Sequence, residues 1–272
     1  MVMRFVLGVL MAFNALFCHA NESVQTISVT PDATLSFVIN ANTNKPKHVL
    51  ILLVGGAGNI NLVKTGNSYR YANGNFLMRA RPLLADQDIV TIAPDVPSDL
   101  VGTGYSDEFR NSERHLEDIQ KLIDYIHEQY LGADIYLVAT SQGTVSSGVL
   151  ALKLGNQIAG VIHTATFSAM SIRAGAPLWN LPYDQVKSRQ VFIHHIDDGC
   201  KWTQFSPLER IAQKNKVVLI AITGGDAGSG DPCQAFTHHG FLGMESEVVN
   251  KIKDWIYIAP KQKNKENSVG LI

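Results

Sequence analysis

Short runs of apolar residues recur along the chain and alternate with segments of helical pattern. Strands of a parallel sheet are apolar throughout, because helices cover both faces of such a sheet. The runs expected to form these strands cover residues 48–54, 88–93, 135–139, 157–165, 190–196 and 216–223. Two segments rich in β-branched residues, 23–30 and 33–39, predict an opening antiparallel pair. The pattern therefore predicts an α/β fold with a mostly parallel central sheet and helices on both faces.

The helical pattern is clearest in residues 110–130, where apolar residues recur at helical spacing and charged residues lie opposite. Gly132 is the expected end of this helix. Residues 76–85 and 245–257 also predict helices, and Pro82 is expected to delay the start of the first. The segment 166–188 is irregular and too short for a separate cap domain. A single domain over residues 21–260 is therefore expected.

Composition agrees with one large α/β domain. The chain has 272 residues, a formal net charge of −1 and 46% hydrophobic residues. Basic residues form no stripe and do not interleave with aromatic residues, so the sequence argues against a nucleic-acid partner. Residues 261–272 are polar and predict a disordered C-terminal tail.

The N-terminus has the pattern of a signal peptide over residues 1–20. Arg4 precedes an apolar run at 5–17, and small residues at Cys18 and Ala20 suit cleavage before Asn21. The run is short for a membrane span, although a membrane anchor or a buried helix are the alternatives. We therefore expect an exported protein, periplasmic or secreted, with no stable membrane anchor after cleavage.

The chemistry of the chain centres on Ala139-Thr140-Ser141-Gln142-Gly143, which lies between an apolar strand and a run of small residues typical of a buried helix. It is the nucleophile-elbow pattern G-x-S-x-G with alanine in the first glycine position. A serine at such a strained turn needs small neighbours on both sides, which are expected to pack against each other. Its hydroxyl would project from the carboxyl edge of the sheet, facing a helix N-terminus. The same short pattern also occurs by chance in other α/β proteins. Whether Ser141 is catalytic therefore depends on residues elsewhere in the chain.

Two later segments supply an acid and a base in a fixed order. Asp197 and Asp198 end the strand at 190–196, and His238 and His239 precede the last helix. With Ser141 and Gly143 these residues follow the order serine, aspartate, histidine, and on them residues 23–257 resemble a single-domain α/β-hydrolase. The resemblance implies Ser141 as the nucleophile, His239 as its base and Asp198 as the carboxylate that orients His239. Asp197 and His238 remain the alternatives for the acid and the base.

The same resemblance implies an oxyanion hole made by two backbone N–H groups. One belongs to Gln142, which follows the nucleophile. The other is assigned to Gly56 in the turn 55–58, with Ala57 as the next candidate. Val54 stands where the family often has a histidine, so this turn departs from the family pattern. A tight turn that needs only the flexibility of glycine is the alternative.

The cysteine count predicts one disulfide. Removal of residues 1–20 discards Cys18 and leaves Cys200 and Cys233, an even pair in an exported protein. Cys200 follows the predicted acid and Cys233 precedes the predicted base. Ends of neighbouring parallel strands lie about 5 Å apart, within reach of a disulfide. The bond is therefore expected to tie the acid loop to the base loop.

Other chemistries fit less well, and neither a metal nor a cofactor is expected. Metal ligation is the alternative for the paired residues His194, His195, Asp197, Asp198, His238 and His239, but neighbours on an extended chain point to opposite faces. The turn at 58–65 lacks the glycine that a phosphate loop places before lysine, and 224–230 lacks the dinucleotide spacing.

The sequence therefore predicts a serine hydrolase, most simply a carboxylic-ester hydrolase that works through an acyl-enzyme and takes a small-molecule ester or acyl substrate. A peptidase or thioesterase would use the same residues, and a non-catalytic binding protein could share the fold. Four large apolar side chains in the segment 166–188 are expected either to wall an acyl pocket or to pack in the core. They are Phe167, Met170, Leu178 and Trp179.

Overall fold

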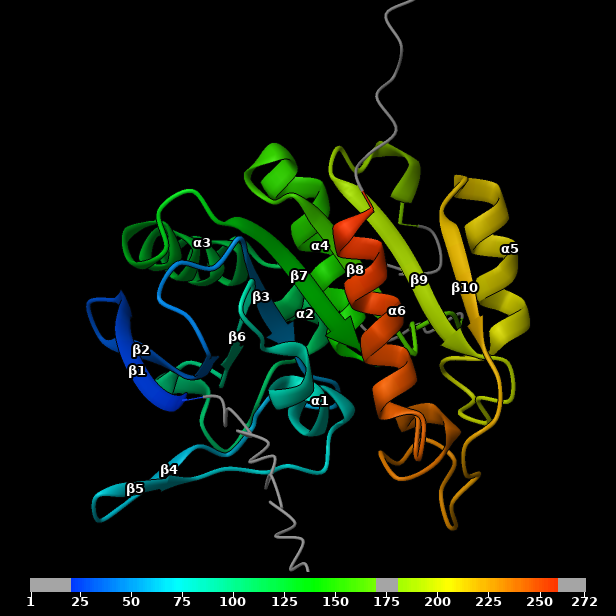
Figure 1. Ribbon diagram of the computed structural model, residues 1–272, viewed down its shortest axis with the longest axis horizontal. Coiled ribbons are helices and arrows are strands. Elements are labelled where there is room, and N and C mark those ends of the chain that lie inside the picture. The colour runs from blue at the N-terminus through cyan, green and yellow to red at the C-terminus, as the bar shows by residue number, and fades with distance from the viewer. Residues whose placement is uncertain (1–20, 170–180, 259–272) are drawn as a thin grey trace, which may run out of the picture.

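A computed structural model describes residues 21–169 and 181–258. Its centre is an eight-stranded sheet with the order β1-β2-β6-β3-β7-β8-β9-β10 (Figure 1). The strands, in sheet order, are β1 (Asn21–Thr30), β2 (Ala33–Ala41), β6 (Ile89–Pro94), β3 (His48–Leu53), β7 (Asp134–Thr140), β8 (Gly160–Thr164), β9 (Arg189–His195) and β10 (Val218–Ile222). The pairs β1–β2 and β2–β6 are antiparallel and the others are parallel. The mostly parallel sheet and the opening antiparallel pair are as predicted.

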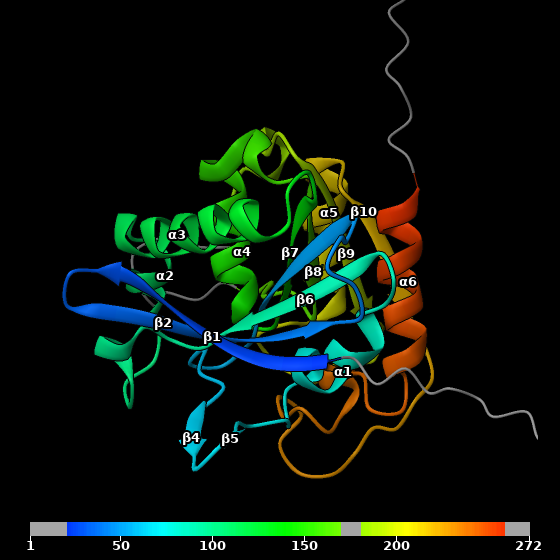
Figure 2. The ribbon, with the colours of Figure 1, turned by 60° about the vertical axis from the view of Figure 1, so that its left-hand side comes forward.

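Helices cover both faces of this sheet (Figures 1 and 2). On one face, α1 (Phe76–Leu84) and α6 (Glu245–Tyr257) pack on Leu50 and Leu52 of β3. On the other face, α3 (Glu113–Gln129) and α4 (Gly143–Leu154) pack on the alternate residues of the same strand, among them Ile51. Alternate side chains of a strand point to opposite faces, so one apolar run supplies two cores. The continuous apolar runs of the sequence reflect this burial on both sides.

Helix α1 starts at Phe76 although Pro82 lies inside it, so the expected late start was wrong. Asn75 caps the helix by accepting a hydrogen bond from the N–H of Leu77 at 2.9 Å. Proline has no N–H to donate to the carbonyl four residues earlier. The guanidinium of Arg81 donates to that carbonyl, on Met78, instead. A side chain thus replaces the missing backbone donor, and the helix continues.

Three further elements differ from the prediction. The helix expected from residue 110 divides into α2 (Asp107–Arg110) and α3, because the hydroxyl of Ser112 accepts from the N–H of His115 and caps α3. Helix α5 (Phe205–Asn215), between β9 and β10, was not predicted, and a hairpin, β4 (Val63–Thr65) and β5 (Ser68–Arg70), forms within a segment read as loop. None of these differences alters the order of the strands.

The parallel strands end at one edge of the sheet, and the segments that follow them carry the predicted site. Ser141 follows β7, Gly55 and Gly56 follow β3, Asp198 follows β9, and the loop with His239 follows β10. In open α/β sheets this edge is where ligands bind. In the described part of the segment 166–188, no separate cap domain forms over it.

Among residues 21–169 and 181–258, no helix combines the length and the apolar character that a membrane crossing requires. The predicted signal peptide at 1–20, the tail at 261–272 and the side chains of Met170, Leu178 and Trp179 lie outside the described residues.

Candidate active site

Ser141 occupies a strained turn between β7 and α4. Its φ angle is +52°, in the left-handed region that side-chain-bearing residues seldom adopt, as expected for a nucleophile elbow. The turn is held because the N–H of Ser141 donates to the carbonyl of Thr164 at 3.1 Å, while its own carbonyl accepts from the N–H of Thr144 at 2.9 Å. The strained conformation therefore has a local structural support.

Glycine is required two residues after Ser141, for a reason that the sequence did not give. A Cβ atom on Gly143 would lie 2.2 Å from the carbonyl oxygen of Leu53 and 2.7 Å from that of Val54. The atoms nearest to such a Cβ thus belong to Leu53, at the end of β3, and to Val54, directly after it. Gly55 is also constrained, although less tightly, since a Cβ there would lie 2.8 Å from the Cβ of Ser141.

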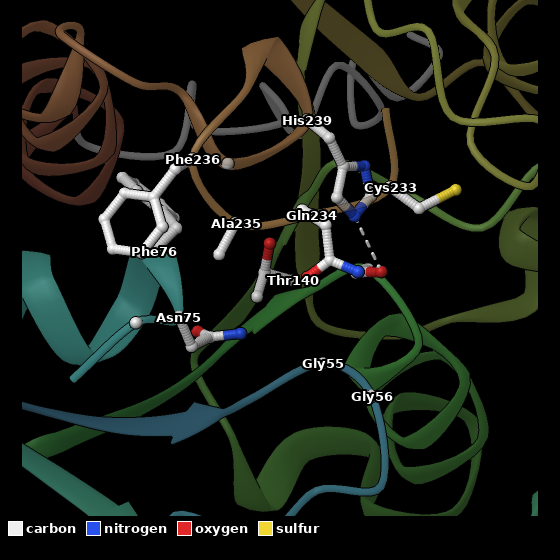
Figure 3. A pocket seen from close by; sticks show the side chains of 13 residues that line it. Gly55, Gly56, Asn75, Phe76, Thr140, Cys233, Gln234, Ala235, Phe236 and His239 are labelled. Carbon is white, nitrogen blue, oxygen red and sulfur yellow. Dashed lines mark hydrogen bonds between the residues drawn. The ribbon is translucent and has the colours of Figure 1, made fainter. Parts of the chain in front are cut away.

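His239 lies between the predicted nucleophile and the predicted acid. Its Nε2 is 2.9 Å from Oγ of Ser141, and its Nδ1 is 3.0 Å from Oδ2 of Asp198. Figure 3 shows the first contact as a dashed line from the His239 ring. The ring is 5% exposed, and its backbone N–H is held by the hydroxyl of Thr237 at 3.1 Å. Residues separated by up to 98 positions thus form one hydrogen-bonded chain.

The alternatives for the acid and the base do not join this chain. Asp197 is exposed, and its backbone N–H donates to Nδ1 of His195 at 3.0 Å. The ring of His238 stacks on that of His195 with a centroid distance of 4.1 Å. The structure therefore brings Ser141, His239 and Asp198 together and leaves Asp197 and His238 aside.

The carboxylate of Asp198 is buried and fully hydrogen bonded. Oδ1 accepts from the N–H of Cys200 at 2.9 Å, and Oδ2 accepts from the hydroxyl of Thr203 at 2.9 Å. Burial alone would raise the pKa of Asp198, but hydrogen bonds from His194 and His239 outweigh it and hold this pKa well below its usual range. Asp198 is therefore ionised at neutral pH, as a partner of an imidazolium must be.

Thr203 and His194 complete this part of the site. The sequence analysis assigned no role to Thr203 and considered His194 only as a possible metal ligand. The Thr203 hydroxyl lies 3.0 Å from Nδ1 of His239 as well as contacting Asp198. His194 accepts from the N–H of Thr166 at Nδ1, so its proton is on Nε2, which lies 2.5 Å from the carbonyl oxygen of Thr203. His194 thus fixes the backbone of Thr203. Its position four residues before Asp198 was the only sign of it in the sequence.

The turn after β3 has its carbonyl groups bonded within the protein. The carbonyl of Gly55 accepts from the N–H of Gly58 at 3.2 Å, that of Gly56 from Nη2 of Arg110 at 2.7 Å, and that of Ala57 from the N–H of Tyr105 at 2.7 Å. In the described part of the chain, the N–H groups of Gly56 and Gln142 have no acceptor. The two predicted oxyanion donors are therefore free to bind a ligand atom.

Cys200 and Cys233 form a disulfide, which confirms the predicted pair. Their Cα atoms are 4.5 Å apart although 33 positions separate them in the sequence. Cys200 lies in the loop of Asp198, and Cys233 lies in the loop that leads to His239. The bond joins the two loops that carry the predicted acid and the predicted base.

The residues considered as metal ligands divide between two environments. His194, Asp198 and His239 belong to the hydrogen-bonded network described above. Among the described residues, His195, Asp197 and His238 place possible ligand atoms within 4.8 Å of one another. However, His195 donates from Nε2 to the carbonyl of Gly224 and accepts at Nδ1, and its ring is within 12° of parallel to that of His238. Lone pairs in parallel rings do not converge on one ion, so this cluster is a poor metal site.

Comparison with known proteins identifies the architecture. The sequence matches no protein-family model and no curated protein. A lidless α/β serine hydrolase from Xanthomonas campestris is 12% identical over 88% of this chain and 97% of its own, with a TM-score of 0.56. A dienelactone hydrolase from Anabaena variabilis is 12% identical over 88% and 97%, with a TM-score of 0.60. A cold-adapted esterase from an Arctic intertidal metagenomic library is 12% identical over 87% and 94%, with a TM-score of 0.56.

The chain has the α/β-hydrolase fold. At these identities the likeness extends to the fold alone, which is the fold that the sequence predicted. Within an α/β-hydrolase fold, Ser141, Asp198 and His239 occupy one edge of the sheet in the expected chain order.

A cavity of about 350 Å³ lies beside Ser141 at this edge of the sheet (Figure 3). Its walls come from the turn after β3, the start of α1, the end of β7 and the loop before His239. Phe76 and Phe236 give it apolar surface. Phe167, one of the residues considered for an acyl pocket, stacks instead on Trp202 at a centroid distance of 5.9 Å. The cavity thus lies on the side of Ser141 that α1 and the His239 loop enclose.

Proposed function

We propose that this chain is a serine hydrolase that cleaves carboxylic esters through an acyl-enzyme. The observation that carries the proposal is the continuous chain from Oγ of Ser141 to Nε2 of His239 and from Nδ1 of His239 to Oδ2 of Asp198. A serine hydroxyl is a weak nucleophile at neutral pH and needs an adjacent base. His239 is within hydrogen-bonding reach, and Asp198 fixes the tautomer that leaves Nε2 free to accept a proton.

The geometry supports a sequence of steps in which His239 moves one proton. Nε2 of His239 takes the proton from Ser141 as Oγ attacks the ester carbonyl carbon. Negative charge develops on the carbonyl oxygen, and the N–H groups of Gln142 and Gly56 are the donors proposed to stabilise it. When the intermediate collapses, His239 gives its proton to the departing alcohol and an acyl-Ser141 remains. A water molecule, deprotonated by His239, then releases the acid and restores Ser141.

Asp198 acts in this scheme without gaining a proton. It accepts the hydrogen bond of Nδ1 and stabilises the imidazolium that forms during attack. Its lowered pKa supports this role, because a carboxylate that stays ionised near a forming cation lowers the barrier electrostatically. Thr203 is a positioning residue, since its hydroxyl holds Oδ2 on the side of His239.

The size of the cavity is the observation that favours a small ester over a peptide. The similar solved structures do not separate the two classes, since they include an esterase and a dienelactone hydrolase but also a putative dipeptidyl aminopeptidase. The cavity beside Ser141 is at the small end of the range for small-molecule sites. We also propose that the protein is exported, which the disulfide beside the site supports, because such bonds persist mainly in oxidising compartments.

The test is a matched series in which one short acyl group is presented as a nitrophenyl ester, a thioester and a nitroanilide. We expect the ester to turn over fastest, and Ser141→Ala to lower kcat by several powers of ten. Ser147→Ala is the matched control, because Ser147 is buried on α4 and bonds to His163. Turnover of the ester by Ser141→Ala at the wild-type rate would refute the proposal, and faster cleavage of the anilide would make the protein a peptidase.

A further inference from the structure

The cavity beside Ser141 has a mixed wall with an uneven distribution of polar groups. Phe76 and Phe236 are its large apolar side chains, and Asn75, Thr140 and Gln234 are polar side chains that need hydrogen bonds. Among the residues that the structure describes, no lysine, arginine, aspartate or glutamate lines it. Arg79 lies nearby, but its guanidinium is bonded to the carbonyls of Gly74, Ala235 and Gly240 and to Glu245. The wall is therefore polar without carrying a charge.

Thr140 is the least exposed of these polar residues. It is 2% exposed, is the last residue of β7 and directly precedes Ser141. In the part of the chain that the structure describes, its hydroxyl has no hydrogen-bond partner, whereas the hydroxyls of Thr144 and Thr164 on either side of the elbow are bonded. Figure 3 shows the Thr140 side chain directed toward Ala235 and Gln234 across the cavity. A hydroxyl in this place is available to a bound molecule.

Asn75 adds a donor whose orientation is known. Its Oδ1 accepts from the N–H of Leu77 as the cap of α1, so the other end of the amide is the NH₂ group. Within the described residues this NH₂ group has no acceptor, and Figure 3 shows it directed toward the side of the cavity where Thr140 and Gly55 lie. The capping bond thus determines which end of the Asn75 amide is the oxygen and which is the nitrogen, an assignment that electron density usually leaves open. Asn75 offers the cavity a donor and no acceptor.

We propose that this cavity binds a neutral polar part of the substrate, one that carries an ether, hydroxyl or amide oxygen near the scissile ester. The inference rests on the proposed function and specifies the substrate class of that site. An alkyl group filling the cavity would strip water from the amide of Asn75 and the hydroxyl of Thr140 and return no hydrogen bond. An oxygen atom accepts from both. A carboxylate is disfavoured because the described residues place no cation in the wall.

Sites built to hydrogen-bond a substrate group reject the analogue that lacks it by large factors. The probes are therefore two pairs of esters that differ by one oxygen for one methylene. On the acyl side, nitrophenyl 3-methoxypropanoate is compared with nitrophenyl pentanoate. On the alcohol side, 2-methoxyethyl acetate is compared with butyl acetate. Rates are divided by those for hydroxide-catalysed hydrolysis, which removes the intrinsic difference in reactivity. We expect the ether to be preferred about tenfold or more in kcat/KM within one of the pairs.

Two variants test whether Thr140 and Asn75 produce this preference. Thr140→Val keeps the shape and removes the hydroxyl, with Thr140→Ser as the control that retains it. Asn75→Ser keeps an oxygen that can cap α1 and removes the amide donor. Each is expected to reduce the preference several-fold, while Thr140→Ser keeps it. Thermal unfolding checks that the variants are folded, and Asn75→Ser, at a half-buried helix cap, serves if Thr140→Val does not fold.

The outcomes separate this inference from the proposed function. Equal rates within both pairs, a preference for the alkyl member, or an ether preference that survives in both variants would overturn the inference and leave the hydrolase standing. No hydrolysis of any ester, together with no reaction of Ser141 with a fluorophosphonate, would overturn both.

Discussion

Arg110 donates a hydrogen bond from Nη2 to the carbonyl oxygen of Gly56, 2.7 Å away, and so holds the turn that carries a proposed oxyanion donor. Its Nη1 bonds the hydroxyl of Ser146 on α4 at 2.8 Å. The side chain is 1% exposed, and burial lowers the pKa of Arg110 to about 10, which leaves it charged at neutral pH. A buried cation thus links the turn after β3 to helix α4, which follows Ser141.

Replacing Arg110 is expected to impair catalysis more than binding. In Arg110→Met the carbonyl of Gly56 loses its donor, so the turn is no longer fixed and the buried positive charge behind it is gone. We expect kcat to fall about 10- to 100-fold with little change in KM, since removal of one oxyanion donor costs about 10²–10³. The affinity of a boronic-acid inhibitor should fall in parallel. Ser146→Ala, which removes the other Arg110 partner, should have a smaller effect. An unchanged kcat in folded Arg110→Met would contradict this role.

The assignment of the acid can be tested by comparing two neighbouring aspartates. Asp198→Asn keeps the shape but can place an NH₂ group against Nδ1 of His239, which favours the wrong tautomer. We expect kcat to fall by about three to four powers of ten. Asp197→Asn alters an exposed side chain and should retain near wild-type turnover. Steady-state kinetics on one nitrophenyl ester measures both, and the reverse ranking would make Asp197 the acid.

The disulfide is expected to contribute to stability as well as to the site. Cys200 and Cys233 close a loop with a sequence separation of 33, for which the chain-entropy model gives about 3–4 kcal/mol. The double variant Cys200→Ser with Cys233→Ser should lose about that much free energy of unfolding in a denaturant titration. Two free thiols in protein purified from an oxidising compartment would show that the bond does not form.

Buried histidines should make the protein less stable as the pH falls below neutral. Burial lowers the pKa of His115 and of His163 to about 3, from 6.5 in the unfolded chain. Between these values the unfolded state binds protons that the folded state does not, so stability is lost as the pH is lowered from about 6.5 toward 3. Over this pH range, protonation linked to each of the two histidines can lower the free energy of unfolding by a few kcal/mol.

The measurement is the free energy of unfolding at pH 7, 6 and 5, in wild type and in His163→Phe. Phenylalanine suits a site lined by Tyr183 and Phe192, and it cannot take up a proton. The variant should show a shallower dependence on pH than the wild type. A wild-type stability that is constant from pH 7 to pH 5 would show that these rings titrate normally in the folded state.

The fold was largely predictable because burial on both faces leaves a strong trace in sequence. The runs at 48–54 and 190–196 contain consecutive apolar positions, 49–54 and 191–193, as strands of a covered sheet do. Helix α5 was missed although its buried residues Leu208, Ile211 and Ala212 fall at helical spacing, because this apolar pattern spans little more than one turn. The break at Ser112 was missed because a capping hydroxyl overrode the longer apolar period.

The site was predictable as far as residue order determines it, and no further. Ser141, Asp198 and His239 could be named because the elbow pattern and the order serine, aspartate, histidine resemble those of an α/β-hydrolase. Arg110 and Thr203 could not, because their contacts depend on how loops fold against each other and leave no spacing in the sequence. The free polar groups of the cavity have the same origin, since only the structure shows which side chains lack a partner.

The central claim is that His239 activates Ser141. Its most direct test is the reaction of the protein with a labelled fluorophosphonate, followed by mapping of the modified peptide by mass spectrometry. We predict one adduct on Ser141, no adduct in Ser141→Ala, and labelling slowed by orders of magnitude in His239→Gln but not in His238→Gln. An adduct on another residue, or equal labelling rates in wild type and His239→Gln, would contradict the claim.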